Sequence, residues 1–219
     1  MLKYPCLILD HDDTVVQSEA TVNYPFFVEF LKEYRPGMTI TAQEYISDCY
    51  NPGYIEMCRR RFGFTDEELD IEYRAWKAHI KTHAPSPYPG IGKLLARFKE
   101  AGGVIVVASQ SVQENILRDY RLHFDLEPDA IYGWDLDPDW RKPNPYAIEQ
   151  AAAKYGFSKE QMLAVDDMKT GVEMARNAGC PIAFAGWGRK EFPQICSEME
   201  ELCDYSFYST EELEKFLFE

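Results

Sequence analysis

The chain has 219 residues, of which 46% are hydrophobic, so it can bury a sizeable core as one large domain or one domain with a small insertion. Its formal net charge of -14 argues against nucleic acid and anionic membrane surfaces as partners, because both are bound through lysine and arginine. The charge is compatible with a small anionic substrate if a bound cation reverses the local field.

The six cysteines are scattered and form no C-x-x-C pair, which predicts reduced and mostly buried thiols. The N-terminus shows no signal-peptide pattern, and no apolar run is long enough to span a bilayer. We therefore expect a cytoplasmic protein that binds neither membranes nor nucleic acid.

A short buried strand is predicted over residues 4–9 (YPCLIL), where an apolar run ends at Asp10. Helical periodicity follows over residues 22–34, 51–63 and 65–81, and no strand pattern interrupts it. Thr65 and Glu68 form a capping-box pattern at the start of the last of these helices. The block ends in the proline-rich APSPYPG. We expect residues 18–83 to form an inserted helical domain, and residues 1–17 and 84–219 to form the core domain.

Strands and helices alternate after this block. Strands are predicted over 104–109, 130–133, 162–167 and 181–186, and helices over 91–103, 111–120, 145–156, 169–180 and 209–218. Alternation of this kind is typical of an α/β fold with a parallel, doubly wound (Rossmann-like) sheet covered by helices on both faces.

Acidic residues follow two of the buried strands. LILDHDDTVV places Asp10, Asp12 and Asp13 after the first strand, and MLAVDD places Asp166 and Asp167 after a later one. The carboxyl ends of parallel strands share one edge, where ligands of open α/β sheets bind. Carboxylates gathered there would repel one another unless a hard cation such as Mg²⁺ bound among them.

Two further residues could contact a phosphate at the same edge. Ser109 ends a strand just before a helix, where a hydroxyl and a backbone N–H suit a phosphate oxygen. Lys142, in DWRKPNP, precedes another helix and could offset phosphate and carboxylate charge. Taken singly, each is a weak signal: a helix N-cap is the better explanation of Ser109 alone, and most loop lysines are simply solvated.

The order of these motifs is more specific than any one of them. D-x-D-x-T after the first strand, serine after a later strand, R-K-P before a helix, and D-D followed by G-x-x-x-A-x-x-A-G resembles the haloacid dehalogenase-like (HAD) superfamily over nearly the whole chain. The inserted helical block resembles the first type of cap domain in that superfamily.

The resemblance implies a role for each matching residue. Asp10 would be the nucleophile that forms an aspartyl-phosphate, and Asp12 the general acid and then the base that activates water. Mg²⁺ would bind the Asp10 carboxylate, the Asp12 backbone carbonyl and Asp167, with Asp166 as its outer partner. The residues expected to hold the phosphoryl group or shape its loop are Thr14, Ser109, Gln110 and Lys142.

Some positions depart from the commonest pattern of the family. Asp13 stands where glycine is frequent, and we interpret it as a structural substitute because aspartate tolerates left-handed backbone. His11 is expected to contribute its backbone only. Similar dehalogenases carry no aspartate at the position of Asp12, so its presence favours a phosphate ester or anhydride. Similar hexose-phosphate mutases carry a histidine where this chain has Val22.

The sequence therefore predicts a Mg²⁺-dependent phosphohydrolase that cleaves a phosphate monoester of a small metabolite, such as a sugar phosphate, phosphoglycolate or a nucleotide. A phosphomutase resembling β-phosphoglucomutase, and a non-catalytic phosphate-binding or interaction protein, are the alternatives. The substrate stays open, and either a monomer or a homodimer is compatible. Arg59, Arg60 and Arg61 are interpreted as a solvated helix face, and Trp187 and Arg189 as a structural loop.

Overall fold

A computed structural model describes residues 2–219. Contacts within the chain divide it into two compact units. One contains the N-terminal segment up to Val16 together with Pro87–Glu219, and the other contains Gln17–Ser86. The cysteines are all free, as expected.

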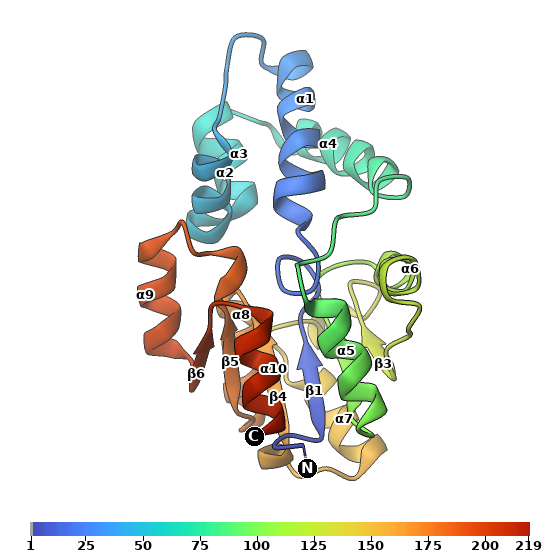
Figure 1. The fold of residues 1–219 in the computed structure, drawn as a ribbon. Coiled ribbons are helices and arrows are strands. Elements are labelled where there is room, and N and C mark those ends of the chain that lie inside the picture. The colour runs from blue at the N-terminus through green and yellow to red at the C-terminus, as the bar shows by residue number, and fades with distance from the viewer. Residues whose placement is uncertain (1) are drawn as a thin grey trace. The chain divides into compact units, whose positions relative to one another are not determined.

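The larger unit is built on a six-stranded, entirely parallel sheet in the order β3-β2-β1-β4-β5-β6 (Figure 1). The strands are β1 (Cys6–Leu9), β2 (Val104–Ala108), β3 (Ala130–Tyr132), β4 (Met162–Asp166), β5 (Ile182–Ala185) and β6 (Tyr205–Phe207). Because β1 pairs with β2 on one side and β4 on the other, the order reverses at β1. This reversal is the point at which open α/β sheets bind their ligands.

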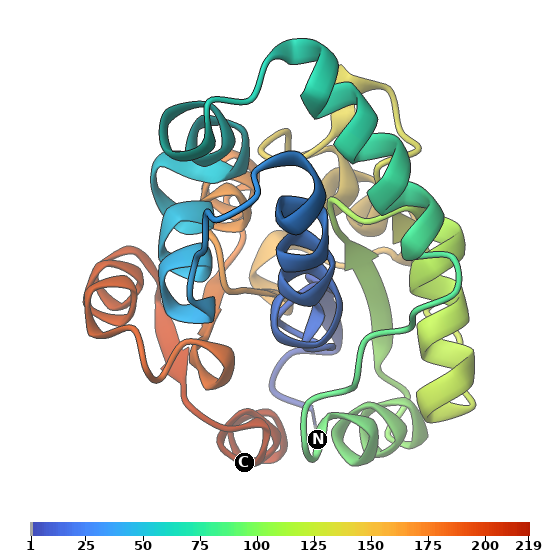
Figure 2. The ribbon, with the colours of Figure 1, turned by 90° about the horizontal axis from the view of Figure 1, so that it is seen from above.

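Helices cover both faces of this sheet. They are α5 (Ile91–Glu100), α6 (Gln113–Phe124), α7 (Tyr146–Tyr155), α8 (Lys169–Ala178), α9 (Pro193–Leu202) and α10 (Thr210–Phe218). Helices α5 and α10 lie side by side on one side of the sheet (Figure 2). The predicted α/β fold class is confirmed, because successive strand residues such as Leu7 and Ile8 point to opposite faces and are both buried.

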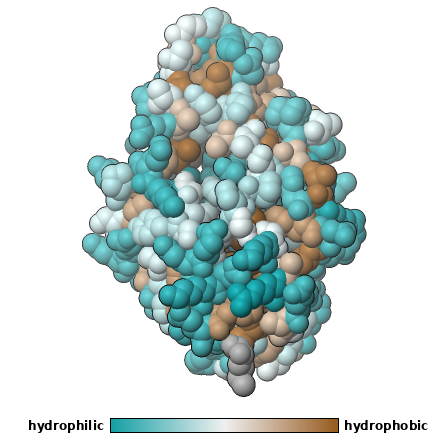
Figure 3. Space-filling model, viewed as in Figure 1, coloured by the Kyte–Doolittle hydropathy of each residue, from teal (hydrophilic) through white to brown (hydrophobic). Residues whose placement is uncertain are grey.

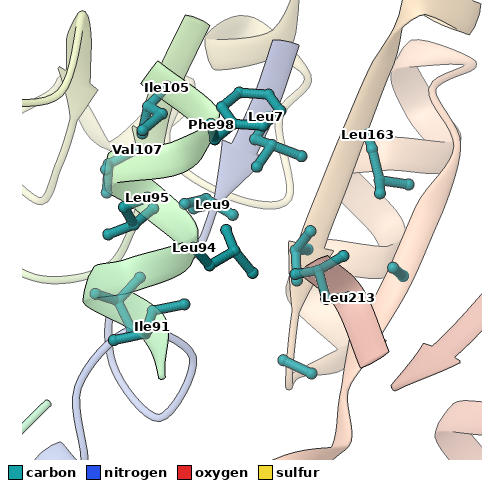
Figure 4. Packing of buried hydrophobic residues seen from close by; sticks show 14 of the residues in the cluster. Leu7, Leu9, Ile91, Leu94, Leu95, Phe98, Ile105, Val107, Leu163 and Leu213 are labelled. Atoms are coloured by element: carbon teal, nitrogen blue, oxygen red, sulfur yellow. The ribbon is translucent and has the colours of Figure 1, made fainter. Parts of the chain in front are cut away.

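The main core lies between α5, α10 and one face of the sheet. In the close-up, Leu94 and Leu95 of α5 lie against Leu9 of β1 and Val107 of the neighbouring β2 (Figure 4). All four side chains are at most 1% exposed. Burying a side chain of this size contributes about 1.5–3 kcal/mol, so the strand that carries Asp10 is firmly anchored.

Three elements of the structure were not predicted. Strand β6 has only three residues and two of them are half-buried, so it leaves almost no periodic signal. Helix α9 begins with Pro193 in its first turn, a start signal that the sequence does show. Helix α2 (Ala42–Asp48) is preceded by a capping box of Thr41 and Glu44, the same pattern that begins α4.

The smaller unit, Gln17–Ser86, contains helices joined by loops and no strand. It contains α1 (Tyr24–Tyr34), α2, α3 (Tyr54–Phe62) and α4 (Asp66–His79), with π-helical segments at Glu19–Asn23 and Cys49–Gly53. Its own core includes Phe27, Leu31, Met57 and Phe62. The capping box predicted for Thr65 and Glu68 is confirmed.

The three consecutive arginines of α3 are all paired within this unit. Arg59 contacts Asp66, Arg60 contacts Glu56, and Arg61 contacts Glu44 and Asp48. Exposed ion pairs of this kind contribute about 0–1 kcal/mol each, and these pairs agree with a solvated helix face.

On the face shown in Figure 3, hydrophilic residues predominate and hydrophobic ones are scattered. Among residues 2–219, no helix is long and apolar enough to cross a membrane.

Glu72 of α4 provides a pH test of the smaller unit's stability. It is 5% exposed, and burial raises its pKa from 4.5 to about 7, although a hydrogen bond from Tyr54 opposes the shift. Because the folded-state pKa is raised, the contribution of Glu72 to stability is greatest below pH 4.5 and is lost as the pH rises through about 7. We expect Glu72→Gln to stabilise the protein by about 2–3 kcal/mol at pH 8 and by little at pH 4.5.

Urea unfolding of both proteins across this pH range measures the difference. Glu33→Gln, at an exposed position of α1, is the control and should show no such trend. A stability difference between Glu72→Gln and wild type that does not vary with pH would contradict the prediction.

Candidate active site

The segment after β1 forms a tight turn that fixes Asp10. The backbone N–H of Asp10 donates to Val165 O at 2.9 Å, which extends the pairing of β1 with β4 by one residue. The carbonyl of His11 then accepts from Val15 N at 2.9 Å and from Val16 N at 3.1 Å. Within this turn Asp13 has a φ of 54°, in agreement with its interpretation as a substitute for glycine.

Lys142 links this turn to the end of β4. Its side chain is 4% exposed, and its Nζ lies 2.6 Å from Asp10 Oδ1 and 2.6 Å from Asp166 Oδ2. Burial lowers the pKa of Lys142, but Asp10 and Asp166 more than offset this and raise it overall. Lys142 is therefore held as a buried cation between two carboxylates.

The two acids after β4 have different partners. Asp166 uses both of its oxygens, because Oδ1 also accepts from Met168 N at 2.9 Å. Asp167 Oδ2 accepts from Arg189 Nε at 2.9 Å, whereas its Oδ1 has no hydrogen-bond partner among the described residues. Gly171, in the first turn of α8, makes room for this arrangement: a Cβ there would lie 2.0 Å from Asp166 Oδ2.

Arg189 joins the acids after β4 to the turn after β1. Its side chain is 5% exposed and lies beside both Asp167 and Asp13, with Nη2 3.0 Å from Asp13 Oδ2. It follows β5, so the turn also contacts a third segment of the chain. Trp187, two residues earlier, donates from Nε1 to Thr14 O at 3.0 Å.

The formal charges of these buried groups do not balance. There are four carboxylates and two cations: Asp10, Asp13, Asp166 and Asp167 against Lys142 and Arg189. Burial raises the pKa of Asp10 well above its usual value, and Lys142 only partly opposes this. The pKa of Asp167 is raised by burial in the same way, against the effect of Arg189.

The excess of two negative charges matches one divalent cation. Asp10, Asp166 and Asp167 each offer a ligand oxygen, and these atoms all lie within 4.8 Å of one another. Hard divalent cations prefer carboxylate oxygens, and binding would favour the ionised acids. The donor set, the charge balance and the unpartnered Asp167 Oδ1 therefore all fit a metal site.

Asp12 lies apart from this group and contacts the loop after β2. Its Oδ2 accepts from Ser111 Oγ and lies 3.5 Å from Ser109 Oγ. Ser109 is 5% exposed, and its Oγ also accepts from Ser111 N at 3.1 Å. The structure thus brings the first two motifs together, as the sequence predicts for strand ends that share one edge.

Two residues expected to contact the phosphate, Thr14 and Gln110, have side chains that are not part of this hydrogen-bond network. Thr14 is completely buried, and its hydroxyl has no hydrogen-bond partner among the described residues. Its surroundings suit the role of shaping the turn. Gln110 is exposed and makes no side-chain hydrogen bond among those described for residues 2–219.

The side chain of His11 has a partner that sequence reasoning missed. His11 is 1% exposed, its Nε2 lies 3.1 Å from Asp119 Oδ2, and its ring stacks on that of Tyr120. Arg118 also contacts Asp119, with Nε donating at 2.8 Å. The turn is therefore tied to α6 as well as to the neighbouring strands.

Arg189 and Ser111 are the other contacts that the sequence did not predict. A charged residue directly after a strand-end W-G pair is the only sequence signal for Arg189. Ser111 repeats the type of Ser109 two residues later, but its bond to Asp12 depends on the turn after β2.

Comparison with known proteins places this site in a family. A model described as haloacid dehalogenase-like hydrolase matches residues 7–185. The chain is 24% identical to pyrophosphatase PpaX of Halalkalibacterium halodurans over 183 residues, which cover 83% of each protein.

Two solved structures share the fold. A putative haloacid dehalogenase-like hydrolase from Bacteroides fragilis has a TM-score of 0.77 and 20% identity, and the match covers 96% of this chain and all of that one. A putative phosphoglycolate phosphatase from Lactobacillus plantarum has a TM-score of 0.75 and 19% identity, covering 98% and 100%. From the matched family model and the acids that it spans, this chain belongs to the haloacid dehalogenase-like hydrolase family.

Proposed function

We propose that the protein is a Mg²⁺-dependent phosphohydrolase that cleaves a phosphate monoester of a small metabolite through an aspartyl-phosphate on Asp10. The observation that carries this proposal is the buried cluster of Asp10, Asp166 and Asp167 around Lys142. Its two uncompensated negative charges suit a divalent cation, and a cation makes the site attractive to a phosphate.

Asp10 acts as the nucleophile in the first of two transfers. One carboxylate oxygen attacks phosphorus, the bond from phosphorus to the leaving oxygen breaks, and an acyl phosphate forms. Lys142 favours the ionised form of this carboxylate against the effect of burial, and it lies close enough to neutralise charge on the phosphoryl oxygens. The metal, when bound, would be held by Asp10, the Asp12 backbone carbonyl and Asp167, with Asp166 as an outer partner, and would stabilise negative charge.

Asp12 acts as the general acid and base. It gives a proton to the leaving alcohol, and the resulting carboxylate then takes a proton from the water that attacks the acyl phosphate. Its side chain is partly exposed and is held by serines, whereas Asp10 is buried beside a cation. Two carboxylates in such different surroundings are suited to different roles.

The remaining assignments follow from position. Ser109 holds a phosphoryl oxygen, because its hydroxyl lies beside Asp12. Gln110 is in the same loop and is free to contact substrate, and Thr14 shapes the turn beneath it. Residues 18–83 act as the cap that selects the leaving group.

The proposed mechanism requires both Asp10 and the metal for activity. Wild-type protein should release phosphate from p-nitrophenyl phosphate with Mg²⁺, and EDTA should abolish the release. Asp10→Asn should lower the rate by about 10³-fold or more, because an amide oxygen cannot serve as the nucleophile.

Asp125→Asn is the control for the general loss of an aspartate, since Asp125 is exposed and lies at the end of α6, outside the acid cluster. Its rate should equal that of the wild type. Phosphate release by Asp10→Asn at the wild-type rate would rule out the proposed nucleophile.

The second prediction concerns Lys142. Lys142→Met keeps the length of the side chain but removes its charge, so we expect kcat to fall by about 10²–10³-fold. The loss of charge also leaves Asp10 and Asp166 without their shared partner, so the melting temperature in EDTA should fall.

Lys154→Met, at an exposed position of α7, controls for the general loss of a lysine. Circular dichroism confirms that each variant is folded. An active Lys142→Met enzyme with unchanged kcat would remove Lys142 from the mechanism.

The third prediction separates the hydrolase from the mutase. Val22 is 3% exposed and apolar, so that position supplies no imidazole for proton transfer. We therefore expect phosphate release from a panel of phosphoglycolate, inorganic pyrophosphate, hexose phosphates and nucleotides, with no interconversion of hexose 1- and 6-phosphates. The relatives make the first two compounds the natural starting points.

Phosphorus NMR follows both outcomes in one sample. Conversion of a hexose 1-phosphate to its 6-phosphate without release of phosphate would favour the mutase instead.

A further inference from the structure

Arg189 is a buried cation for which the proposed mechanism has no use. Its guanidinium binds Asp167 Oδ2 through Nε and Nη2, and Nη2 also lies 3.0 Å from Asp13 Oδ2. The side chains of all three residues are at most 5% exposed. A buried positive charge within the acid cluster must affect the affinity for any other cation that binds there.

Arg189 divides the two oxygens of Asp167. It binds Oδ2 and leaves Oδ1 buried without a hydrogen-bond partner among the described residues. One oxygen is therefore engaged by a permanent cation, while the other remains available to a metal ion.

The charge on Arg189 has opposite effects on folding and on metal binding. Without metal, it offsets repulsion among carboxylates that burial has removed from water, and so favours folding. With metal, it is a positive charge one carboxylate away from another cation, and so opposes binding.

We propose that Arg189 is a built-in counter-ion of the metal site, which keeps the metal-free core folded at the expense of affinity for Mg²⁺. This inference rests on the metal site of the proposed function. It assigns Arg189 as a positioning and charge-balancing residue that acts through Asp167, and it pairs Arg189 with Asp13 as the acid whose charge it compensates.

Substitutions at Asp13 and Arg189 test this proposal because they change the formal charge of the site. Arg189→Met removes one positive charge and leaves the site more negative, whereas Asp13→Asn combined with Arg189→Met restores the formal charge of the wild type. Asparagine tolerates the left-handed backbone at φ 54°, so this change does not strain the turn. Arg189→Lys retains the charge but loses the two-nitrogen contact with Asp167.

Isothermal titration calorimetry of the full-length proteins with Mg²⁺ measures the effect directly and does not depend on turnover. We expect Arg189→Met to bind Mg²⁺ about tenfold or more tightly than the wild type. The double variant and Arg189→Lys should stay within about threefold of the wild type. Arg97→Met, which removes the partner of Glu214 on α10, should change nothing.

Thermal unfolding supplies a second readout. In EDTA, Arg189→Met should melt at a lower temperature than the wild type, and Mg²⁺ should raise its melting temperature by more. If Arg189→Met does not fold without metal, the double variant decides, since it should fold in EDTA and bind Mg²⁺ as the wild type does.

The possible failures are distinguishable. Absence of Mg²⁺ binding by the wild type would overturn the metal site, and with it both the proposed function and this inference. Binding by the wild type, with equal or weaker binding by Arg189→Met, would overturn the counter-ion alone, as would a double variant that does not restore wild-type affinity.

Discussion

The crowding of buried carboxylates at one edge of the sheet is the constraint on which the rest of this structure depends. Burial penalises each charge, and neighbouring acids penalise one another, so such a cluster opposes folding unless cations accompany it. Lys142 and Arg189 supply two of them. They arrive from opposite directions, one in the segment between β3 and α7 and the other after β5. The loops of the α/β core are therefore tied together by the charges that they carry.

Sheet topology is what brings these charges to one place. The order reverses at β1, which has β2 and β4 as its two neighbours, so the turn after β1 meets the ends of both. Asp10 is fixed by its backbone bond to Val165, and Gly171 leaves space for Asp166 at the start of α8. Both constraints act through the backbone. They let side chains that are distant in the sequence lie within hydrogen-bonding distance of one another.

The sequence alone predicts the parts of this arrangement that follow from the pattern of apolar and acidic residues. Strand ends and their acids are visible because a buried parallel strand is a short apolar run, and Asp10 and Asp166 mark where two such runs stop. Contacts between segments that are distant in the sequence leave no such pattern. Arg189 lies in a loop with no periodicity, the bond of His11 to Asp119 joins a turn to a helix, and β6 is too short for its burial pattern to show.

The surroundings of Asp10 and Asp12 differ in a way that supports the different roles that we propose for these two acids. Asp10 is buried, and its pKa is raised by that burial, so the nucleophilic role that we propose for it needs Lys142 and a metal to favour its ionised form. Asp12 is more exposed and hydrogen-bonded to serine hydroxyls, which neither supply a charge nor remove one. The turn after β1 separates the two acids by one residue, His11, whose buried side chain contacts Asp119 of α6. The two carboxylates on this turn therefore lie in different surroundings, one beside a buried cation and the other beside serine hydroxyls, which suits the two successive phosphoryl transfers that we propose.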